Sequence, residues 1–284
     1  MTSVGRCILV MLLRVLGIID TRTEAKLNCQ IDLELYNYTL NKVKNAKVLK
    51  EPFPHVFIED IFQPDFYPCI LNKLPDGKRR GPYKSFKSER YLVKLADRTG
   101  VQLQPGARDY REATAKALDI NFWTEFTEMF ANPELGRQWV ETLGASTSKR
   151  YDPQGEDKKI RFVYRMDLSR DLSGYEIGPH TDTDFKWVTT LFYLPSTAKH
   201  SGVGTAILKS KSGRVQKSGT RHMPWGSDWT VHSRAPFIPN SVFAFAPCWH
   251  SWHAVPKMKE QVTRDTLQGF VQSSKRTSKF PCGR

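Results

Sequence analysis

The stretch GPHTDTDFKWVTTLFYLP, residues 178–195, places His180 and Asp182 two positions apart, directly before a long apolar run. Residues i and i+2 of a β-strand point to the same face, so His180 and Asp182 would face one space while Thr181 faces the other way. One further imidazole from a distant strand would complete three ligands around one metal ion. Asp184, two residues on, is expected to stay solvated or to shape the mouth of such a site.

The third ligand is expected on a late strand, where CWHSWHAVP, residues 248–256, offers two histidines. His253 is favoured because it lies within the apolar WHAV, whereas His250 falls nearer the turn after Pro247 and stays the alternative. Two histidines and one carboxylate with open positions is the ligand pattern of non-haem Fe(II) oxygenases.

Eleven residues beyond His253, the stretch TRDTLQGFVQ puts Arg264 at the head of another predicted strand. Thr266 lies two positions later and therefore on the same face. A guanidinium with a neighbouring hydroxyl is a suitable receptor for a carboxylate.

Short apolar or alternating runs recur through the second half of the chain, separated by turn-forming residues, and they predict a β-sandwich or jelly-roll barrel. The first half predicts helices, one of them with Asn132 as its cap, Pro133 in its first turn and Gly144 as its stop. We therefore expect an α+β protein with a mainly β core, a double-stranded β-helix of the jelly-roll, cupin-like type, and helices packed outside it. The strand-like runs are IRFVYRMDL, KWVTTLFYL, GTAILK, SVFAFAP, WHAV and DTLQGFVQ.

The ordered set HTD, WHAV and RDT resembles the Fe(II)- and 2-oxoglutarate-dependent oxygenase superfamily, most closely its prolyl-hydroxylase-like branch. The resemblance covers about residues 160–272, with a weaker likeness of PFPHVFIEDIF, residues 52–62, to an opening strand. It implies one oxygenase domain over residues 27–273, with mixed helical support over 27–159 and the jelly-roll core over 160–273. Residues 1–26 would be an extension of uncertain nature, and 274–284 a basic tail.

The resemblance also implies roles for individual residues. His180, Asp182 and His253 would hold Fe(II), and Arg264, helped by Thr266, would pair with the distal carboxylate of 2-oxoglutarate. Tyr193 and Tyr175 stand where the family often places groups that touch cosubstrate or substrate. The reaction would use O2, convert 2-oxoglutarate to succinate and CO2, and hydroxylate an unactivated carbon. Many members of this branch have Lys in place of Arg264, which leaves the subfamily open.

The formal charge of +14 and the lack of any acidic residue between Asp184 and Asp228 suggest a basic rim that attracts an anionic substrate, or else only a soluble hairpin. The substrate would be a small molecule, a glycan or a peptide. Oxidative demethylation of nucleic acid is a second hypothesis, but that branch carries another Arg six residues after the first, where this chain has Phe270. A third is a jelly roll that binds sugar or metal without turnover.

The five cysteines are far apart, odd in number and without a C-x-x-C pair, which favours a reducing compartment and a cytoplasmic location. The apolar start of the chain, residues 1–20, is like a signal peptide, but it is interrupted by Arg14, lacks a clear cleavage site and is too short to span a bilayer. No transmembrane segment is expected.

Overall fold

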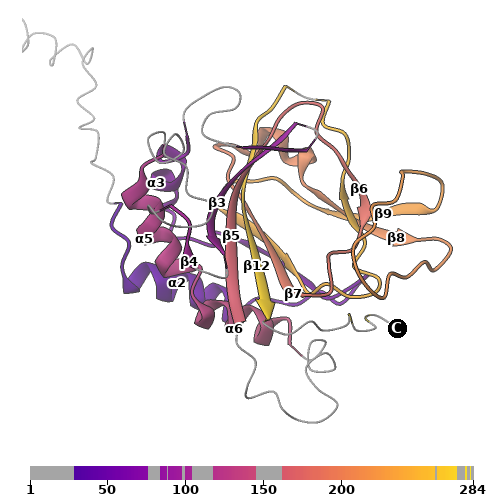
Figure 1. The fold of residues 1–284 in the computed structure, drawn as a ribbon, viewed down its shortest axis with the longest axis horizontal. Helices are drawn as coiled ribbons and strands as arrows, with labels where there is room; N and C mark the ends of the chain where they lie inside the picture. Colours follow the sequence, from indigo (N-terminus) through magenta and orange to yellow (C-terminus); the bar gives the residue numbers. More distant parts are fainter. Residues whose placement is uncertain are drawn as a thin grey trace, which may run out of the picture.

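A computed structural model describes residues 29–75, 84–87, 89–97, 100–103, 118–144, 162–259, 261–273, 279 and 282. Two antiparallel sheets face each other, and the large sheet lies between the helices and the small sheet (Figure 1). The predicted mainly β, jelly-roll fold is confirmed. The predicted extension over residues 1–26 and most of residues 76–117 lie outside the described residues, and the domain limits at 27, 160 and 273 stay predictions.

The large sheet has the strand order β1-β10-β7-β12-β5-β3-β2, with β4 paired to β3, and the small sheet has the order β6-β11-β8-β9. The strands of the large sheet are β1 (His55–Glu59), β2 (Lys84–Lys87), β3 (Arg90–Asp97), β4 (Gly100–Val101), β5 (Phe162–Asp171), β7 (Lys186–Tyr193), β10 (Ser241–Phe245) and β12 (Arg264–Ser273). Those of the small sheet are β6 (Ile177–His180), β8 (Thr205–Ser210), β9 (Trp229–Ala235) and β11 (His253–Val255).

The helices begin at the polar caps that the sequence supplies. The side chain of Asn132 accepts a hydrogen bond from the Leu135 backbone N–H, and Pro133 follows as the first helical residue, as predicted. This helix packs closely on the outer face of the large sheet, since a Cβ at Gly136 would lie 3.4 Å from the Cβ of Tyr164. The helices are α2 (Leu33–Lys44), α3 (Tyr67–Asn72), α5 (Ile120–Phe130), α6 (Pro133–Thr142) and the 3-10 helix η2 (Ala198–Val203).

The inner face of the large sheet carries a group of polar side chains that fall into rows across neighbouring strands. Arg264 of β12 is in register with Asp171 of β5, which is in register with Arg90 of β3. Two residues further along β12, Thr266 pairs with Ser169 and with Tyr193. Because strand residues alternate between faces, the even-numbered residues of β12 point toward the small sheet while its odd-numbered residues pack outward.

The structure pairs four of the five cysteines in two disulfides, Cys29–Cys69 and Cys248–Cys282, with Cα atoms 5.5 and 5.7 Å apart. The expectation of reduced cysteines is therefore wrong for these four, because partners 40 and 34 residues apart in sequence are brought together only by the fold. Disulfides persist in oxidising surroundings, so the cysteines no longer support a cytoplasmic location. Within the described part of the chain, no helix is long and apolar enough to span a bilayer.

Candidate metal site and cavity

The structure brings His180, Asp182 and His253 together on the small sheet. β6 ends at His180 and β11 begins at His253, and these two residues are direct partners across the two strands. Asp182 follows two residues after β6, and one ligand atom from each of the three side chains lies within 4.8 Å of the others. All three side chains are buried. Two strand ends and one turn thus present an N, N, O donor set to one point.

Backbone carbonyls fix the orientation of both imidazoles. His180 Nδ1 lies 2.8 Å from the carbonyl oxygen of Gly178, and His253 Nδ1 lies 2.9 Å from that of Ser251. A carbonyl oxygen can only accept, so each Nδ1 carries the proton and each Nε2 keeps its lone pair. Metal-binding histidines are commonly held in this way.

The charge states also suit a metal. Burial lowers the pKa of His180 well below its usual value, and the neighbouring His253 lowers it further. Burial likewise lowers the pKa of His253, so both rings are neutral. Burial alone would raise the pKa of the Asp182 carboxyl, but the charged ammonium group of Lys186 opposes it, and that pKa lies below its usual value. The site therefore offers two neutral nitrogens and one carboxylate.

Both oxygens of the Asp182 carboxylate have protein partners. Oδ1 accepts from Lys186 Nζ at 2.8 Å, and Oδ2 accepts from the Thr189 hydroxyl at 2.5 Å. Thr183 directly follows Asp182 and lines the cavity. Its hydroxyl is buried and has no hydrogen-bond partner among the described residues. An unpartnered buried hydroxyl beside the three donors fits a bound group that would satisfy it.

Neither His250, the alternative third ligand, nor Asp184 belongs to this cluster. His250 Nδ1 lies 3.0 Å from the Cys282 carbonyl oxygen, which turns the ring toward the end of the chain. Asp184 lies outside the group of three.

Arg264 is buried and lines the same cavity. Its Nη1 donates to Asp171 Oδ2 at 2.7 Å, and its Nε donates to the Val203 carbonyl at 3.0 Å. Its Nη2 donates to the hydroxyl of Thr205 at 3.5 Å. Thr266 is buried on the same face, and its hydroxyl accepts instead from Gln268.

A second arginine, which no local sequence pattern marks, joins Arg264. Arg90 donates to both oxygens of Asp171, from Nε at 2.6 Å and from Nη2 at 2.8 Å. One carboxylate thus bridges two guanidinium groups and leaves one net positive charge at this end of the cavity. Only the pairing of β3 with β5 and of β5 with β12 reveals the group, because nothing near Arg90 in the sequence marks it.

The two tyrosines lie beside this pair of arginines, and both are buried. The Tyr193 hydroxyl donates to Thr205 Oγ1 at 2.7 Å, and the Arg264 guanidinium lies 5.4 Å from the Tyr193 ring centre. The Arg90 guanidinium lies 4.3 Å from the ring centre of Tyr175, whose hydroxyl has no partner within the described part of the chain. Burial raises the pKa of both phenols, so both are neutral.

The cavity between the sheets has a volume of about 290 Å³, near the lower limit of small-molecule sites. Apolar side chains, those of Ile177, Leu191 and Val255, line it together with the metal cluster and Arg264. Phe270 also lines it, with Lys186 Nζ 3.9 Å and the Arg165 guanidinium 5.6 Å from its ring centre. The cavity is therefore lined by both apolar and cationic side chains.

Asp167 is a second buried carboxylate in this cavity, and no motif in the sequence marks it either. Arg165 contacts both of its oxygens, and the Asp167 side chain is 2% exposed. Burial raises the pKa of Asp167, and the opposing effect of Arg165 does not fully offset it.

No family model matches the chain, and no curated protein matches it in sequence. Among solved structures, it is similar to a 2OG-Fe(II) oxygenase family oxidoreductase from Burkholderia pseudomallei, at 13% identity and a TM-score of 0.38, over 86% of this chain and 91% of that one. It is also similar to a prolyl-4-hydroxylase from Pseudomonas putida, at 10% identity and a TM-score of 0.41, over 84% and 98%. A third is the epimerase SnoN in complex with Fe3+ and alpha ketoglutarate, at 8% identity and a TM-score of 0.42, over 85% and 84%. At such values the likeness is distant, and the functional proposal rests on the residues of the cavity.

Proposed function

We propose that this chain is an Fe(II)- and 2-oxoglutarate-dependent dioxygenase that hydroxylates an unactivated carbon. The observation that carries the proposal is the set of His180, Asp182 and His253, whose ligand atoms lie within 4.8 Å in a cavity that Arg264 also lines. Two imidazoles and one carboxylate leave three metal positions open, enough for a bidentate cosubstrate and O2.

Each side chain would have a distinct task. His180, Asp182 and His253 would hold the metal, with the Gly178 and Ser251 carbonyls keeping both imidazoles in the Nδ1–H form. Arg264 and Thr205, with Arg90 behind Asp171, would receive the distal carboxylate of 2-oxoglutarate. The apolar wall between the two groups would exclude water from the reacting atoms. The bound metal and cosubstrate would supply the oxidising chemistry, in which decarboxylation to succinate and CO2 accompanies oxidation of the substrate.

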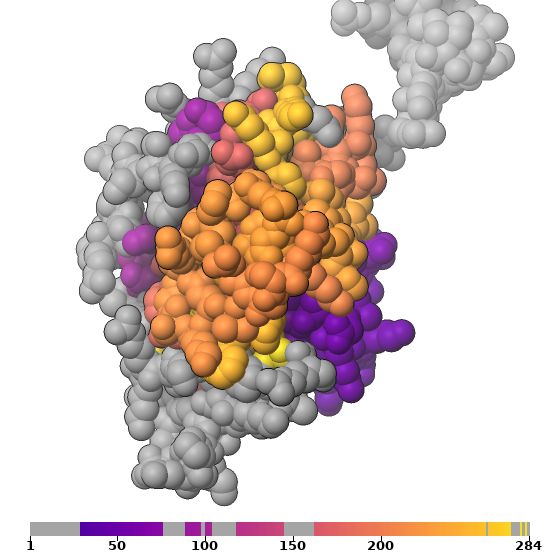
Figure 2. Space-filling view, turned by 90° about the vertical axis from the view of Figure 1, so that its right-hand side faces the viewer, coloured from indigo at the N-terminus to yellow at the C-terminus, as the bar shows by residue number. Residues whose placement is uncertain are grey.

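The charges around the cavity favour an anionic substrate. Four cations, those of Arg90, Arg165, Lys186 and Arg264, face the three carboxylates of Asp167, Asp171 and Asp182, which leaves one positive charge. A divalent metal and a doubly charged cosubstrate cancel each other, so the surplus remains for the substrate. Residues 209–221 add a basic rim beside the small sheet, on the face seen in Figure 2. A small molecule, a peptide or a glycan with a carboxylate or phosphate group fits these charges.

Anaerobic titration of Fe(II) and then 2-oxoglutarate, followed through the weak visible charge-transfer band, tests the proposal. We expect a band in the wild type and none in His180→Ala, with His232→Ala on the exposed strand β9 as the matched control. Arg264→Lys keeps the charge but loses the guanidinium fork, so the band should need about tenfold more 2-oxoglutarate. Arg137→Lys, exposed on helix α6, should behave as wild type.

The absence of a band in folded, iron-loaded wild type would contradict the proposal and favour a binding protein without turnover. Where the band is present, succinate formation with carboxylated, phosphorylated and neutral compounds tests the substrate class. Turnover of the anionic compounds should fall as ionic strength rises, because salt screens the basic rim. Turnover of neutral compounds alone would contradict an anionic substrate.

A further inference from the structure

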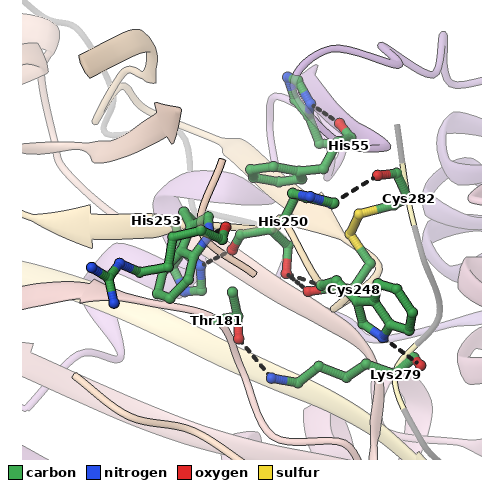
Figure 3. The surroundings of a disulfide bond; sticks show 12 residues. His55, Thr181, Cys248, His250, His253, Lys279 and Cys282 are labelled. Carbon is green, nitrogen blue, oxygen red and sulfur yellow. Dashed lines mark hydrogen bonds between the residues drawn. A yellow bond between two sulfur atoms is a disulfide. The ribbon is translucent and has the colours of Figure 1, made fainter. Parts of the chain in front are cut away.

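Lys279, near the end of the chain, contacts the turn that carries His180 and Asp182. Cys282 is joined to Cys248 by a disulfide, and Lys279, three residues earlier, is a lysine with a side chain buried to 3% exposure (Figure 3). Lysine is almost never fully buried in a folded protein unless it is paired, so its position calls for a specific reason.

The buried ammonium group is directed at the residue between two of the proposed metal ligands. Lys279 Nζ donates to Thr181 Oγ1 at 2.6 Å (Figure 3). It also donates to the Gly219 carbonyl oxygen at 2.6 Å. Thr181 is fully buried, and its own hydroxyl donates to Gln216 Oε1 at 3.2 Å. His180 and Asp182 line the cavity whereas Thr181 is not among its lining residues, so Lys279 contacts the turn from the side away from the cavity.

Further contacts hold Lys279 and Cys282 in place. Trp249 Nε1 donates to the Lys279 carbonyl at 2.9 Å, and His250 Nδ1 lies 3.0 Å from the Cys282 carbonyl oxygen. Both anchors, like Cys248, belong to the short stretch that precedes His253. Lys279 and Cys282 therefore connect the turn that carries His180 and Asp182 to the loop that leads into the third ligand.

We propose that Lys279 is a positioning residue for the metal site, acting through Thr181, and that the Cys248–Cys282 disulfide keeps it in place. The inference rests on the proposed metal site but adds a residue outside it. Loss of a residue that orients metal ligands typically costs 10- to 100-fold in metal affinity. Loss of the Lys279 contact, or of the disulfide, should weaken metal binding while the sheets stay folded.

Binding of Co(II), followed by its visible absorption and by competition with a chelator, tests the proposal without turnover. Lys279→Met keeps most of the side-chain length and removes the ammonium, so we expect about tenfold weaker binding and altered Co(II) bands. Lys259→Met, exposed just after β11, is the matched control. The Cys248→Ser/Cys282→Ser pair should weaken binding as well, whereas Cys29→Ser/Cys69→Ser, which removes the other disulfide, should not.

A double-mutant cycle distinguishes positioning from general loosening. If Lys279 acts through Thr181, Lys279→Met should add little further loss in a Thr181→Val background, because Val keeps the volume and removes the acceptor. Additive losses, or a Lys279→Met variant with wild-type Co(II) affinity and bands, would overturn the inference. Should Lys279→Met not fold, Thr181→Val alone must weaken Co(II) binding for the inference to stand. A wild type that binds no Co(II) would instead contradict the proposed function.

Discussion

At the scale of single residues, the cavity depends on one carboxylate that serves two arginines. Asp171 is fully buried, and it accepts from Arg90 and from Arg264. Breaking a buried ion pair from one side is strongly destabilising, because the remaining charge is left without compensation.

Asp171→Asn should therefore lower the free energy of unfolding by about 3–5 kcal/mol, since it leaves two guanidinium groups without their shared counter-charge. Urea unfolding followed by circular dichroism measures the loss. Asp65→Asn, at an exposed position before helix α3, should change stability by less than about 0.5 kcal/mol. Equal stability of the two variants would show that the arginines do not depend on Asp171.

His55 gives a residue-scale prediction that concerns pH. The ring is 3% exposed, its Nδ1 lies 2.8 Å from the Phe53 carbonyl oxygen, and burial lowers its pKa from the usual 6.5. The unfolded chain then binds this proton more readily than the folded chain. The stabilisation is fully present above pH 6.5 and is lost as pH falls from 6.5 toward the lowered folded pKa.

Unfolding free energy in the presence of a chelator should accordingly fall as pH decreases from 7 to 5. His55→Phe should reduce that slope by up to one proton, about 1.4 kcal/mol per pH unit, because Phe fills the space beside Phe53 and Phe243 without titrating. The buried rings of His180 and His253 should keep a residual slope. A slope unchanged by His55→Phe would mean that His55 titrates alike in both states.

At the scale of elements, the sequence predicts best the strands that alternate or are wholly apolar. Six strands coincide with predicted runs: β5, β7, β8, β10, β11 and β12. Burial of one or both faces of a strand requires alternating or continuous apolar residues, which are easily recognised in the sequence. The strand predicted through His180 and Asp182 is shorter than expected, because β6 ends at His180 and Asp182 lies two residues beyond it. Gly178 and Pro179, which normally break strands, leave β6 without a clear pattern of its own. β9 was missed because most of its side chains are exposed, so no apolar alternation marks it.

Strand β12 also carries an element-scale prediction at Gly269. A Cβ there would lie 2.2 Å from Thr190 Oγ1 and 2.5 Å from the Tyr164 ring, and those two side chains are hydrogen-bonded to each other at 2.7 Å. Gly269→Ala must therefore displace two side chains that hold each other in place, and it should destabilise the protein by about 2–3 kcal/mol.

Gly202→Ala, in η2, is the matched control, since nothing lies within 4 Å of its added Cβ. It should stay within about 0.5 kcal/mol of wild type. The two variants are compared by urea midpoints at constant slope. A Gly269→Ala protein as stable as Gly202→Ala would show that Tyr164 moves aside at no cost.

At the scale of the whole molecule, the sequence predicts local sets and misses groups assembled from distant segments. His180, Asp182 and His253 were predicted because a two-residue spacing and an apolar strand mark them locally. Arg90 and Asp171 meet Arg264 only through the register of three strands, which no short window of sequence contains. The same reason hides the two disulfides, since an odd count of widely spaced cysteines does not specify pairing.

The disulfides provide the prediction at this largest scale. The Cys29–Cys69 bond closes a loop of 40 residues and ties the start of the described chain to helix α3. Loop-closure entropy for that length corresponds to about 4 kcal/mol of stabilisation, so Cys29→Ser/Cys69→Ser should unfold at clearly lower urea concentration. Wild type under reducing conditions should lose at least as much. Peptide mapping after alkylation without reductant should recover Cys29 joined to Cys69 and Cys248 joined to Cys282. Alkylation of all four thiols in the unreduced, unfolded protein would contradict both bonds and restore the case for a reducing compartment.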